Sequence, residues 1–380
     1  MAKHRGADVI IIGGGVIGLS LAWRLSRQGG RVTLLERGEV GKESSRAAAG
    51  MLLPFGETQA RDPFFSLCLA SLKRYPAFVR ELEDLTGMRV DHLASGALYP
   101  VLGDESRERL LRRFGWQKEF GLSHEALGRR QIRARYPGLS PDIETAYFVR
   151  NDQQVDNRKL LSALFVACEI GAVSVEENQE VKEILVRRGR AAGVKTASGY
   201  FEAPWIINAA GAWSSRIPSP FPNAAARVKV SPIRGQRITL DPTERSRRFH
   251  PKTIIFSHGC YLVPRQDGTM ILGATEEEDG YSKRVTPEGV SGLLARALKL
   301  FPALRYFTLR HIECGLRPAT ADRKPLLGPT PLKGYVMATG HYRNGILLAP
   351  ITAQAVSELV LTRSLPAVLK AFQPSRVQVA

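Results

Sequence analysis

A glycine-rich stretch near the amino terminus, the G-x-G-x-x-G pattern of residues 13–18, constrains the fold of this 380-residue chain more than any other feature. It follows a short apolar run rich in β-branched residues, 8–12, and opens a segment with apolar residues on one helical face. A second apolar run, 31–35, follows at once and ends in Glu36. The order strand, turn, helix, strand predicts a βαβ unit with a parallel strand pair.

Each residue type in this unit has a mechanical reason to be there. Gly13 permits a tight turn, and Gly15 allows the backbone to approach a pyrophosphate. Gly18 and Ala22 allow the helix to pack close to the sheet, and the helix N-terminus favours phosphate charge. Glu36 is placed to accept hydrogen bonds from both ribose hydroxyls, and it would repel a 2′-phosphate. The unit therefore predicts binding of FAD or NAD rather than NADP.

The pattern alone does not separate FAD from NAD. Residues 41–51 are small and polar and then very small, which suits backbone lying against a flat ligand. A small-residue helix packed in the core has the same composition, so both interpretations stay open at this point.

Composition bounds the class of protein. The hydrophobic content of 44% and the charged content of 24% are those of an ordinary globular protein, and the length favours two domains. The apolar run 9–23 is short and rich in glycine, which argues against a membrane helix or a signal peptide. Four widely spaced cysteines argue against a zinc site or a disulfide framework, so we expect no metal and a reducing cytoplasm.

The formal charge of +18 bears on partners rather than on fold. The basic residues are spread along the chain, with no aromatic interleaving and no nucleic-acid motif. This pattern favours a solvated basic surface that attracts an anionic substrate over a nucleic-acid-binding protein.

Several longer stretches, taken together, resemble the D-amino-acid oxidase superfamily of flavoproteins, and within it the bacterial glycine oxidases associated with thiamin thiazole biosynthesis. The resemblance covers nearly the whole chain. It rests on residues 7–36, 44–53, 205–215 (WIINAAGAWSS), 260–275 (CYLVPRQDGTMILGAT), 314–328 (CGLRPATADRKPLLG) and 340–350 (GHYRNGILLAP).

The resemblance implies noncovalent FAD. Besides the glycines of the first pattern, it implies cofactor contacts at six groups of residues. These are Val16 and Ile17, Glu36 and Arg37, Ser44 and Ser45, Ala49, Gly50 and Met51, Val181, and the flavin-wrapping residues His341, Tyr342, Arg343, Asn344, Gly345, Ile346 and Leu347. The last group fits the sequence itself, because Asn344-Gly345 is typical of a turn and residues 346–361 predict an apolar helix.

Three side chains are implied at the substrate. Arg317 precedes a proline, so it should be extended at a strand end, and its matching family residue grips the substrate carboxylate in two parallel hydrogen bonds. Tyr261 matches a hydroxyl that reaches the same carboxylate. Arg343 matches a second arginine, which could serve structure instead. Glycine oxidases often carry a histidine two residues before the tyrosine, and this chain has Gly259 there and His258 one place earlier.

Cys314 is a candidate for covalent flavin attachment, because the related sarcosine oxidases use a cysteine in this region. Alignment on Thr320 and Asp322 places that cysteine at Gly315. Cys314 is then one residue out of register and should point away.

The expected fold is α/β. A Rossmann-like FAD-binding domain with a parallel sheet would hold residues 1–86, 146–230 and 310–380. A substrate domain with a mixed or antiparallel sheet would hold 87–145 and 231–309. By resemblance the chain would be a homo-oligomer, often a tetramer.

The implied reaction is oxidation of glycine, sarcosine or D-alanine by hydride transfer from the substrate Cα to the flavin, with no side-chain acid or base required. Oxygen would then reoxidise the flavin and give hydrogen peroxide. Three alternatives stay open: a D-amino-acid dehydrogenase with a quinone acceptor, a tRNA-modifying flavoprotein, and a nucleotide-binding module without activity.

Overall fold

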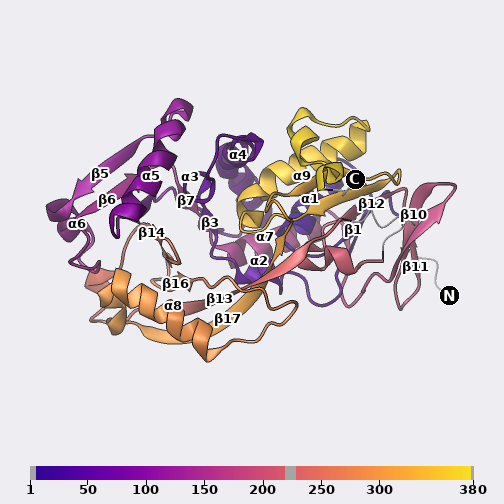
Figure 1. Ribbon diagram of the computed structural model, residues 1–380. Coiled ribbons are helices and arrows are strands. Elements are labelled where there is room, and N and C mark those ends of the chain that lie inside the picture. The colour runs from indigo at the N-terminus through magenta and orange to yellow at the C-terminus, as the bar shows by residue number, and fades with distance from the viewer. Residues whose placement is uncertain (1–5, 219–227, 378–380) are drawn as a thin grey trace.

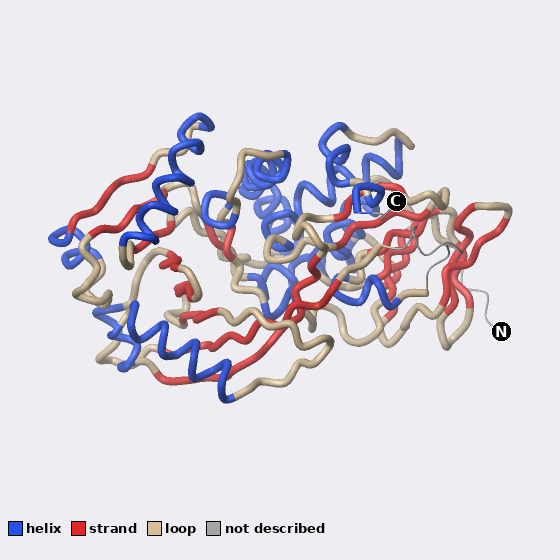
Figure 2. The backbone as a smooth tube through the Cα atoms, in the orientation of Figure 1, coloured by secondary structure: helices blue, strands red, loops and turns tan. Residues whose placement is uncertain are grey.

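The fold contains two large β-sheets, and the chain passes back and forth between them (Figure 1). The structure is a computed structural model that describes residues 6–218 and 228–377. Figure 2 shows helices gathered mainly around the sheet that holds the amino-terminal strands.

The first sheet has six strands in the order β18-β19-β12-β1-β2-β8. Its neighbours pair in parallel except for β18 with β19. The predicted βαβ unit is present as β1, α1 and β2, and both strands are buried on both faces. The bounds are β1 Val9–Ile12, α1 Val16–Ser26, β2 Val32–Leu35, β8 Ser174–Glu176, β12 Trp205–Asn208, β18 Leu326–Pro329 and β19 Tyr335–Thr339.

The second sheet has eight strands in the order β17-β13-β16-β15-β14-β4-β6-β5. All neighbours are antiparallel except β14 with β4. The bounds are β4 Ala97–Pro100, β5 His124–Gly128, β6 Thr145–Val149, β13 Ser231–Asp241, β14 Ile254–Ser257, β15 Cys260–Pro264, β16 Met270–Gly273 and β17 Thr308–Ala319. The α/β class with a parallel sheet and a second, largely antiparallel sheet is therefore confirmed.

The domain boundaries stay a prediction, but strand pairing differs from them in two places. Residues 145–149 and 308–319 were assigned mostly to the FAD part, and they form β6 and β17 of the eight-stranded sheet. Sequence periodicity marks a strand but not its partner, and β17 pairs with β13 across separations from 67 residues (Asp241 with Thr308) to 88 residues (Ser231 with Ala319).

The helices α1, α7 and α9 contact strands of the first sheet. α1 packs against α9 and α7, and α4 packs against α9. By length and composition α9 could cross a membrane, but 72% of its 18-residue apolar stretch is buried inside the protein. α8 packs against β13 and β15 of the other sheet. The bounds are α4 Pro63–Thr86, α7 Asn157–Ile170, α8 Pro287–Leu300 and α9 Gly345–Thr362.

The remaining elements are short or peripheral. They are the helices α2 Ser44–Ala47, α3 Pro54–Glu57, α5 Asp104–Gln117 and α6 Arg129–Arg135, the two-stranded pair β3 Met51–Leu52 and β7 Gln153–Gln154, the three-stranded sheet β9 Glu183–Arg187, β10 Arg190–Lys195 and β11 Tyr200–Glu202, and the 3-10 turns η1 Lys118–Phe120, η2 Gly211–Arg216, η4 Arg247–Phe249, η5 Pro302–Tyr306, η6 Ala367–Phe372 and η7 Pro374–Val377.

Candidate functional site

A long cavity is lined by residues from both large sheets, at the ends of β1, β2, β12 and β19 on one side and along β13, β15 and β17 on the other. Every residue that the sequence singles out for cofactor or substrate lines this cavity, except Gly18 and Leu347. Leu347 of α9 is 1% exposed and packs in the hydrophobic core, so its side chain does not face the cavity. Ligands of open α/β sheets bind at this edge, outside the carboxyl ends of the strands.

The glycine pattern forms a tight cradle at the start of α1. Gly13 has φ +107°, and a Cβ atom there would lie 2.6 Å from the carbonyl oxygen of Ala209. Gly18 approaches the carbonyl oxygen of Gly13 so closely that no side chain fits between them. The first turn of α1 contains no acidic residue, its N-cap residue Gly15 has no side chain, and the N–H of Val16 donates to Ser45 Oγ. This end of the helix therefore offers backbone donors and a positive dipole to an anion.

Glu36 lies at the end of β2 and is 8% exposed. One carboxylate oxygen accepts the backbone N–H of Gly14 at 2.7 Å, and the other accepts that of Gly38 at 3.0 Å. The carboxylate is thus fixed against the glycine turn and still lines the cavity. Its free lone pairs suit the two hydroxyls of a ribose.

A cation–π contact closes the same end of the cavity. The Arg37 guanidinium carbon lies 3.9 Å from the centre of the Trp213 ring, and Arg37 also pairs with Glu43 at 2.9 Å. Val181 also lines the cavity, and its implied contact with the cofactor stays a prediction. The role of Trp213 was not predicted, although the residue lies inside the WIINAAGAWSS stretch that carries the resemblance.

The small-residue segment 41–51 forms a wall of the cavity rather than a helix packed in the core. Only its four residues 44–47 are helical, as α2. Ser45 Oγ accepts the backbone N–H of Val16 at 3.0 Å, and Ser44 Oγ donates to the carbonyl oxygen of Leu316. Both predicted serines thereby hold the wall against its neighbours.

Two side chains that were not predicted from the sequence, the buried Asn157 and the partly buried Arg265, support this wall. Asn157 donates to the carbonyl oxygens of Ser45 and Arg46, at 2.8 and 2.9 Å. Arg265 donates to the carbonyl oxygen of Ala49 at 2.9 Å and to Oδ1 of Asn157 at 3.0 Å. Burial lowers the pKa of Arg265 to about 10. The only signal for Arg265 was its place in the CYLVPRQDG stretch.

Arg317 lies near the end of β17 and faces the cavity, so its predicted extended conformation is confirmed. Its Nη1 atom donates to the carbonyl oxygen of Thr275 at 3.0 Å and, more weakly, to that of Arg234 at 3.5 Å. Among the side chains that the structure describes, those of residues 6–103, 107–218 and 228–377, no carboxylate forms an ion pair with it. The guanidinium is therefore positioned by main-chain oxygens that leave its charge uncompensated.

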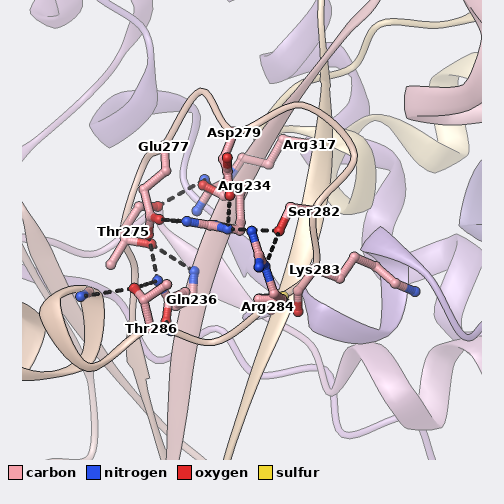
Figure 3. A network of polar contacts seen from close by, with 12 residues as sticks. Arg234, Gln236, Thr275, Glu277, Asp279, Ser282, Lys283, Arg284, Thr286 and Arg317 are labelled. Carbon is pink, nitrogen blue, oxygen red and sulfur yellow. Dashed lines mark hydrogen bonds and ion pairs between the residues drawn. The ribbon is translucent and has the colours of Figure 1, made fainter.

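The segment 274–286, which connects β16 to α8, supports Arg317 from one side (Figure 3). Arg234 is 5% exposed and pairs with Glu277 and Asp279 of this segment. Gln236 Nε2 donates to Glu277 at 2.7 Å and to Thr286 at 2.9 Å. Thr275 Oγ1 accepts the backbone N–H of Gln236 at 2.9 Å, so this polar network fixes the Thr275 carbonyl that holds Arg317.

Tyr261 lines the cavity from β15, and its ring stacks on Phe256 with centroids 6.5 Å apart. Burial raises the pKa of Tyr261, and the positive charges of Arg317, Arg237 and Arg343 act against this rise. The hydroxyl is therefore protonated at neutral pH and available as a donor to a carboxylate.

Arg343 lies between two carboxylates. Its Nη2 atom pairs with Glu276, and its Nη1 atom lies 3.5 Å from Glu57. Tyr342 Oη donates to the other oxygen of Glu276 at 2.5 Å. These ion pairs favour the structural role that the sequence left open for Arg343.

The sequence did not point to Arg237, a buried arginine that also belongs to the site. Arg237 on β13 is 2% exposed, lines the cavity and pairs with Glu313 of β17. Arg158 donates to the same carboxylate oxygen at 2.5 Å. Burial acts to raise the pKa of Glu313, but the charges of Arg237 and Arg158 outweigh it and the pKa is lowered. Glu313 therefore stays ionised beneath the cavity.

The register around Cys314 agrees with the sequence. Gly315 lines the cavity and Cys314 does not, because the Cys314 thiol donates to the carbonyl oxygen of Lys283 at 2.6 Å. Gly259, where relatives often have histidine, lines the cavity with φ +85°, whereas His258 does not line it. All four cysteines are free thiols.

The carboxyl-terminal stretch closes the cavity where α9 begins. Asn344 is the N-cap of α9, which runs from Gly345 to Thr362 and so confirms the predicted apolar helix with one more residue at each end. His341 Nε2 lies 3.1 Å from Thr352 Oγ1, and burial lowers the pKa of His341 to about 3. His341 is thus a neutral structural side chain at this wall.

The residues present fit FAD: a glycine cradle at a helix N-terminus, a buried ribose-binding carboxylate, and a cavity continuing from there to a free arginine. The sequence profile of the family described as "FAD dependent oxidoreductase" matches residues 8–359. The chain belongs to this family. The oxidoreductase therefore uses FAD as its cofactor.

Individual relatives support the same assignment. The oxidoreductase is 31% identical to the glycine oxidase of Geobacillus kaustophilus over 93% of this chain and 92% of that protein. The crystal structure of glycine oxidase from Geobacillus kaustophilus superposes with a TM-score of 0.90, covering 98% of this chain and 99% of that one. The chain is also 39% identical to the bifunctional protein ThiO/ThiG of Synechocystis sp., over 97% of its own length and 54% of that protein. It thus spans about half the length of such fused relatives.

Proposed function

We propose that this FAD-dependent oxidoreductase oxidises the amine of glycine or of a similarly small amino acid, such as sarcosine or D-alanine. The observation that carries the proposal is the uncompensated guanidinium of Arg317, which faces the cofactor cavity beside the protonated Tyr261 hydroxyl. A carboxylate is the group that such a pair of donors recognises.

The protein's share of the reaction is orientation. Arg317 and Tyr261 bind the carboxylate of the substrate, and this fixes the direction in which its Cα and amine extend. Bound FAD supplies the two-electron oxidant for the Cα–H bond and passes the electrons on, with O2 as the proposed acceptor and hydrogen peroxide as the product. The imine that leaves is hydrolysed by water, so glycine gives glyoxylate and ammonia, whereas sarcosine gives glyoxylate and methylamine.

The proposed reaction needs no side chain as an acid or a base. Burial keeps His341 neutral, and Glu313 is held ionised by two arginines. Neither is needed as a base, because a substrate amine that binds in its neutral form already has its lone pair free to support the developing positive charge. The likeness to ThiO/ThiG proteins supports a role in making the thiamin thiazole precursor.

The first experiment is the visible spectrum of the FAD-loaded protein, taken without oxygen before and after addition of glycine, sarcosine or D-alanine. Bleaching of the yellow colour by one of them is the expected result and ranks the substrates. A spectrum that none of them changes contradicts the proposal. Admitting air then tests the acceptor, because an oxidase recovers its colour and forms peroxide, whereas a quinone-dependent dehydrogenase stays bleached.

Arg317→Ala tests the carboxylate site itself. We expect the KM for glycine to rise by about a hundredfold with FAD content unchanged, because the substrate loses a bidentate charged partner. Arg133→Ala is the matched control, since Arg133 is an exposed arginine of α6. An unchanged KM in Arg317→Ala would remove Arg317 from the site.

A further inference from the structure

The substrate end of the cavity holds two arginines in opposite electrostatic states. Arg343 pairs with Glu276 and with Glu57, so two carboxylates share one guanidinium. Arg317 donates to two carbonyl oxygens, and no carboxylate partner for it occurs among the described side chains of residues 6–103, 107–218 and 228–377. Both arginines and Glu57 line the cavity. The charges of the arginines act to lower the pKa of the Tyr261 hydroxyl, and the charge of Glu57 acts to raise it.

Glu276 is locked in the ionised form at this place. Tyr342 Oη donates to it at 2.5 Å, and Arg323 lies 3.1 Å from the same oxygen. Burial acts to raise the pKa of Glu276, but the hydrogen bond from Tyr342 and the charge of Arg343 outweigh it, and the pKa is lowered. Glu276 therefore holds Arg343 across the neutral pH range.

Glu57 adds a negative charge on the cavity wall. It belongs to α3, its side chain is only 11% exposed, and it lines the cavity. The second anionic group of a dianionic ligand would lie near the carboxylate of Glu57 and near Arg343, which is already paired with Glu276 and Glu57. Like charges in a partly dehydrated site repel strongly, and a paired guanidinium attracts an anion weakly.

We propose that Glu276 and Glu57 set the substrate class of this site: they hold Arg343, leave Arg317 to bind the carboxylate, and so admit amines with one carboxylate while rejecting those with a second anionic group. The proposal rests on the proposed function and narrows it. It makes Glu276 and Glu57 specificity-determining residues for the oxidation.

Sarcosine and iminodiacetate form the matched test pair, because they differ only in a methyl hydrogen replaced by a carboxylate. The wild-type enzyme should have a kcat/KM for sarcosine at least about tenfold above that for iminodiacetate, as one unfavourable charge contact requires. In Glu276→Gln the ratio of iminodiacetate to sarcosine should rise by about tenfold, because Arg343 is freed while the hydrogen-bonding shape is kept. Raising the salt concentration should reduce this change.

Glu278→Gln is the control, since Glu278 undergoes the same chemical change two residues away on an exposed part of the segment. Glu57→Gln is the second variant and should raise the same ratio. Each variant is compared in melting temperature and FAD content, which separates a specificity change from misfolding.

Binding without turnover tests the proposal independently of the reaction. Methoxyacetate and diglycolate copy sarcosine and iminodiacetate with oxygen in place of the amine nitrogen, so neither is an amine substrate. Calorimetry on the FAD-loaded protein should show tighter binding of methoxyacetate in the wild type, and a gain for diglycolate in Glu276→Gln.

The possible outcomes separate the two proposals. If no amine reduces the flavin but methoxyacetate binds more tightly than diglycolate, the proposed function fails and the charge selection stands. If the wild type handles both members of each pair equally, or if Glu276→Gln changes the ratios no more than Glu278→Gln, the charge selection is overturned.

Discussion

The guanidinium of Arg317 lies across Gly235, so closely that a Cβ atom at Gly235 would come within 2.4 Å of it. Arg317 is held from the other side by the Thr275 carbonyl oxygen. A methyl group in Gly235→Ala must therefore displace the guanidinium. We expect the KM for glycine to rise by at least about tenfold, since small misplacements of a positioning group cost one to two orders of magnitude. Steady-state kinetics measures this.

Gly115→Ala is the control for that change, because nothing lies within 4 Å of a Cβ atom at Gly115. It should leave KM unaltered. A Gly235→Ala enzyme with the wild-type KM would show that Arg317 can move away without loss, and hence that its present position is not the productive one.

Glu36 should control FAD affinity. In Glu36→Ala the cofactor loses a charged acceptor, and the turn loses the bonds that its carboxylate makes to Gly14 and Gly38. We expect the Kd for FAD to rise by roughly tenfold to a hundredfold, because hydrogen bonds to a charged group are among the stronger ones. Titration of the apoprotein followed by flavin fluorescence measures it. Glu169→Ala, an exposed change on α7, is the control and should bind FAD normally.

Gly315 and Ala47 should be coupled. A Cβ atom at Gly315 would lie 2.6 Å from that of Ala47, and both residues line the cavity. Gly315→Ala should therefore weaken FAD binding by pushing the wall of α2 into the cavity, and adding Ala47→Gly should restore part of the loss. Equal FAD affinities in the single and the double variant would contradict this steric account.

Asp152 should make stability depend on pH. It is fully buried, Tyr99 Oη donates to it at 2.5 Å, and burial raises its pKa from 3.8 to about 8. The folded state then binds a proton that the unfolded state releases above about pH 4. The free energy of unfolding must fall as the pH rises through this window to about 8.

Asp152→Asn removes this titration, so the melting temperature of the variant should gain on that of the wild type between pH 5 and about pH 8. Asp84→Asn, at an exposed position of α4, should follow the wild type. If the melting temperatures of Asp152→Asn and wild type changed in parallel with pH across this range, the pKa of the buried Asp152 carboxyl would not be raised.

The sequence predicted the parts of the site that depend on local backbone chemistry. The glycine turn and Glu36 could be placed because a βαβ unit imposes fixed positions on both. Arg317 could be placed on an extended strand because of the proline that follows it. The substrate residues and the flavin-wrapping turn came from the family resemblance rather than from local pattern.

Other features depend on contacts between distant segments, which no local pattern encodes. The pairing of Arg343 with Glu57 and Glu276 joins three segments, the longest separation being 286 residues from Glu57 to Arg343. The stacking of Arg37 on Trp213 and the pairing of β17 with β13 are of the same kind. Domain boundaries taken from the sequence inherit this difficulty, because a strand's partner decides its sheet.

The segment 274–286 contacts the site at four separate places. Thr275 holds Arg317, Glu276 holds Arg343, Tyr281 Oη donates to the carbonyl oxygen of Ala212 at 3.1 Å, and Lys283 pairs with Glu43 at 3.1 Å. The spacing of these four contacts fixes the segment's length. An insertion or deletion here would disturb substrate choice and cofactor retention together, so a change of substrate in this scaffold must come from replacing side chains and not from exchanging the loop.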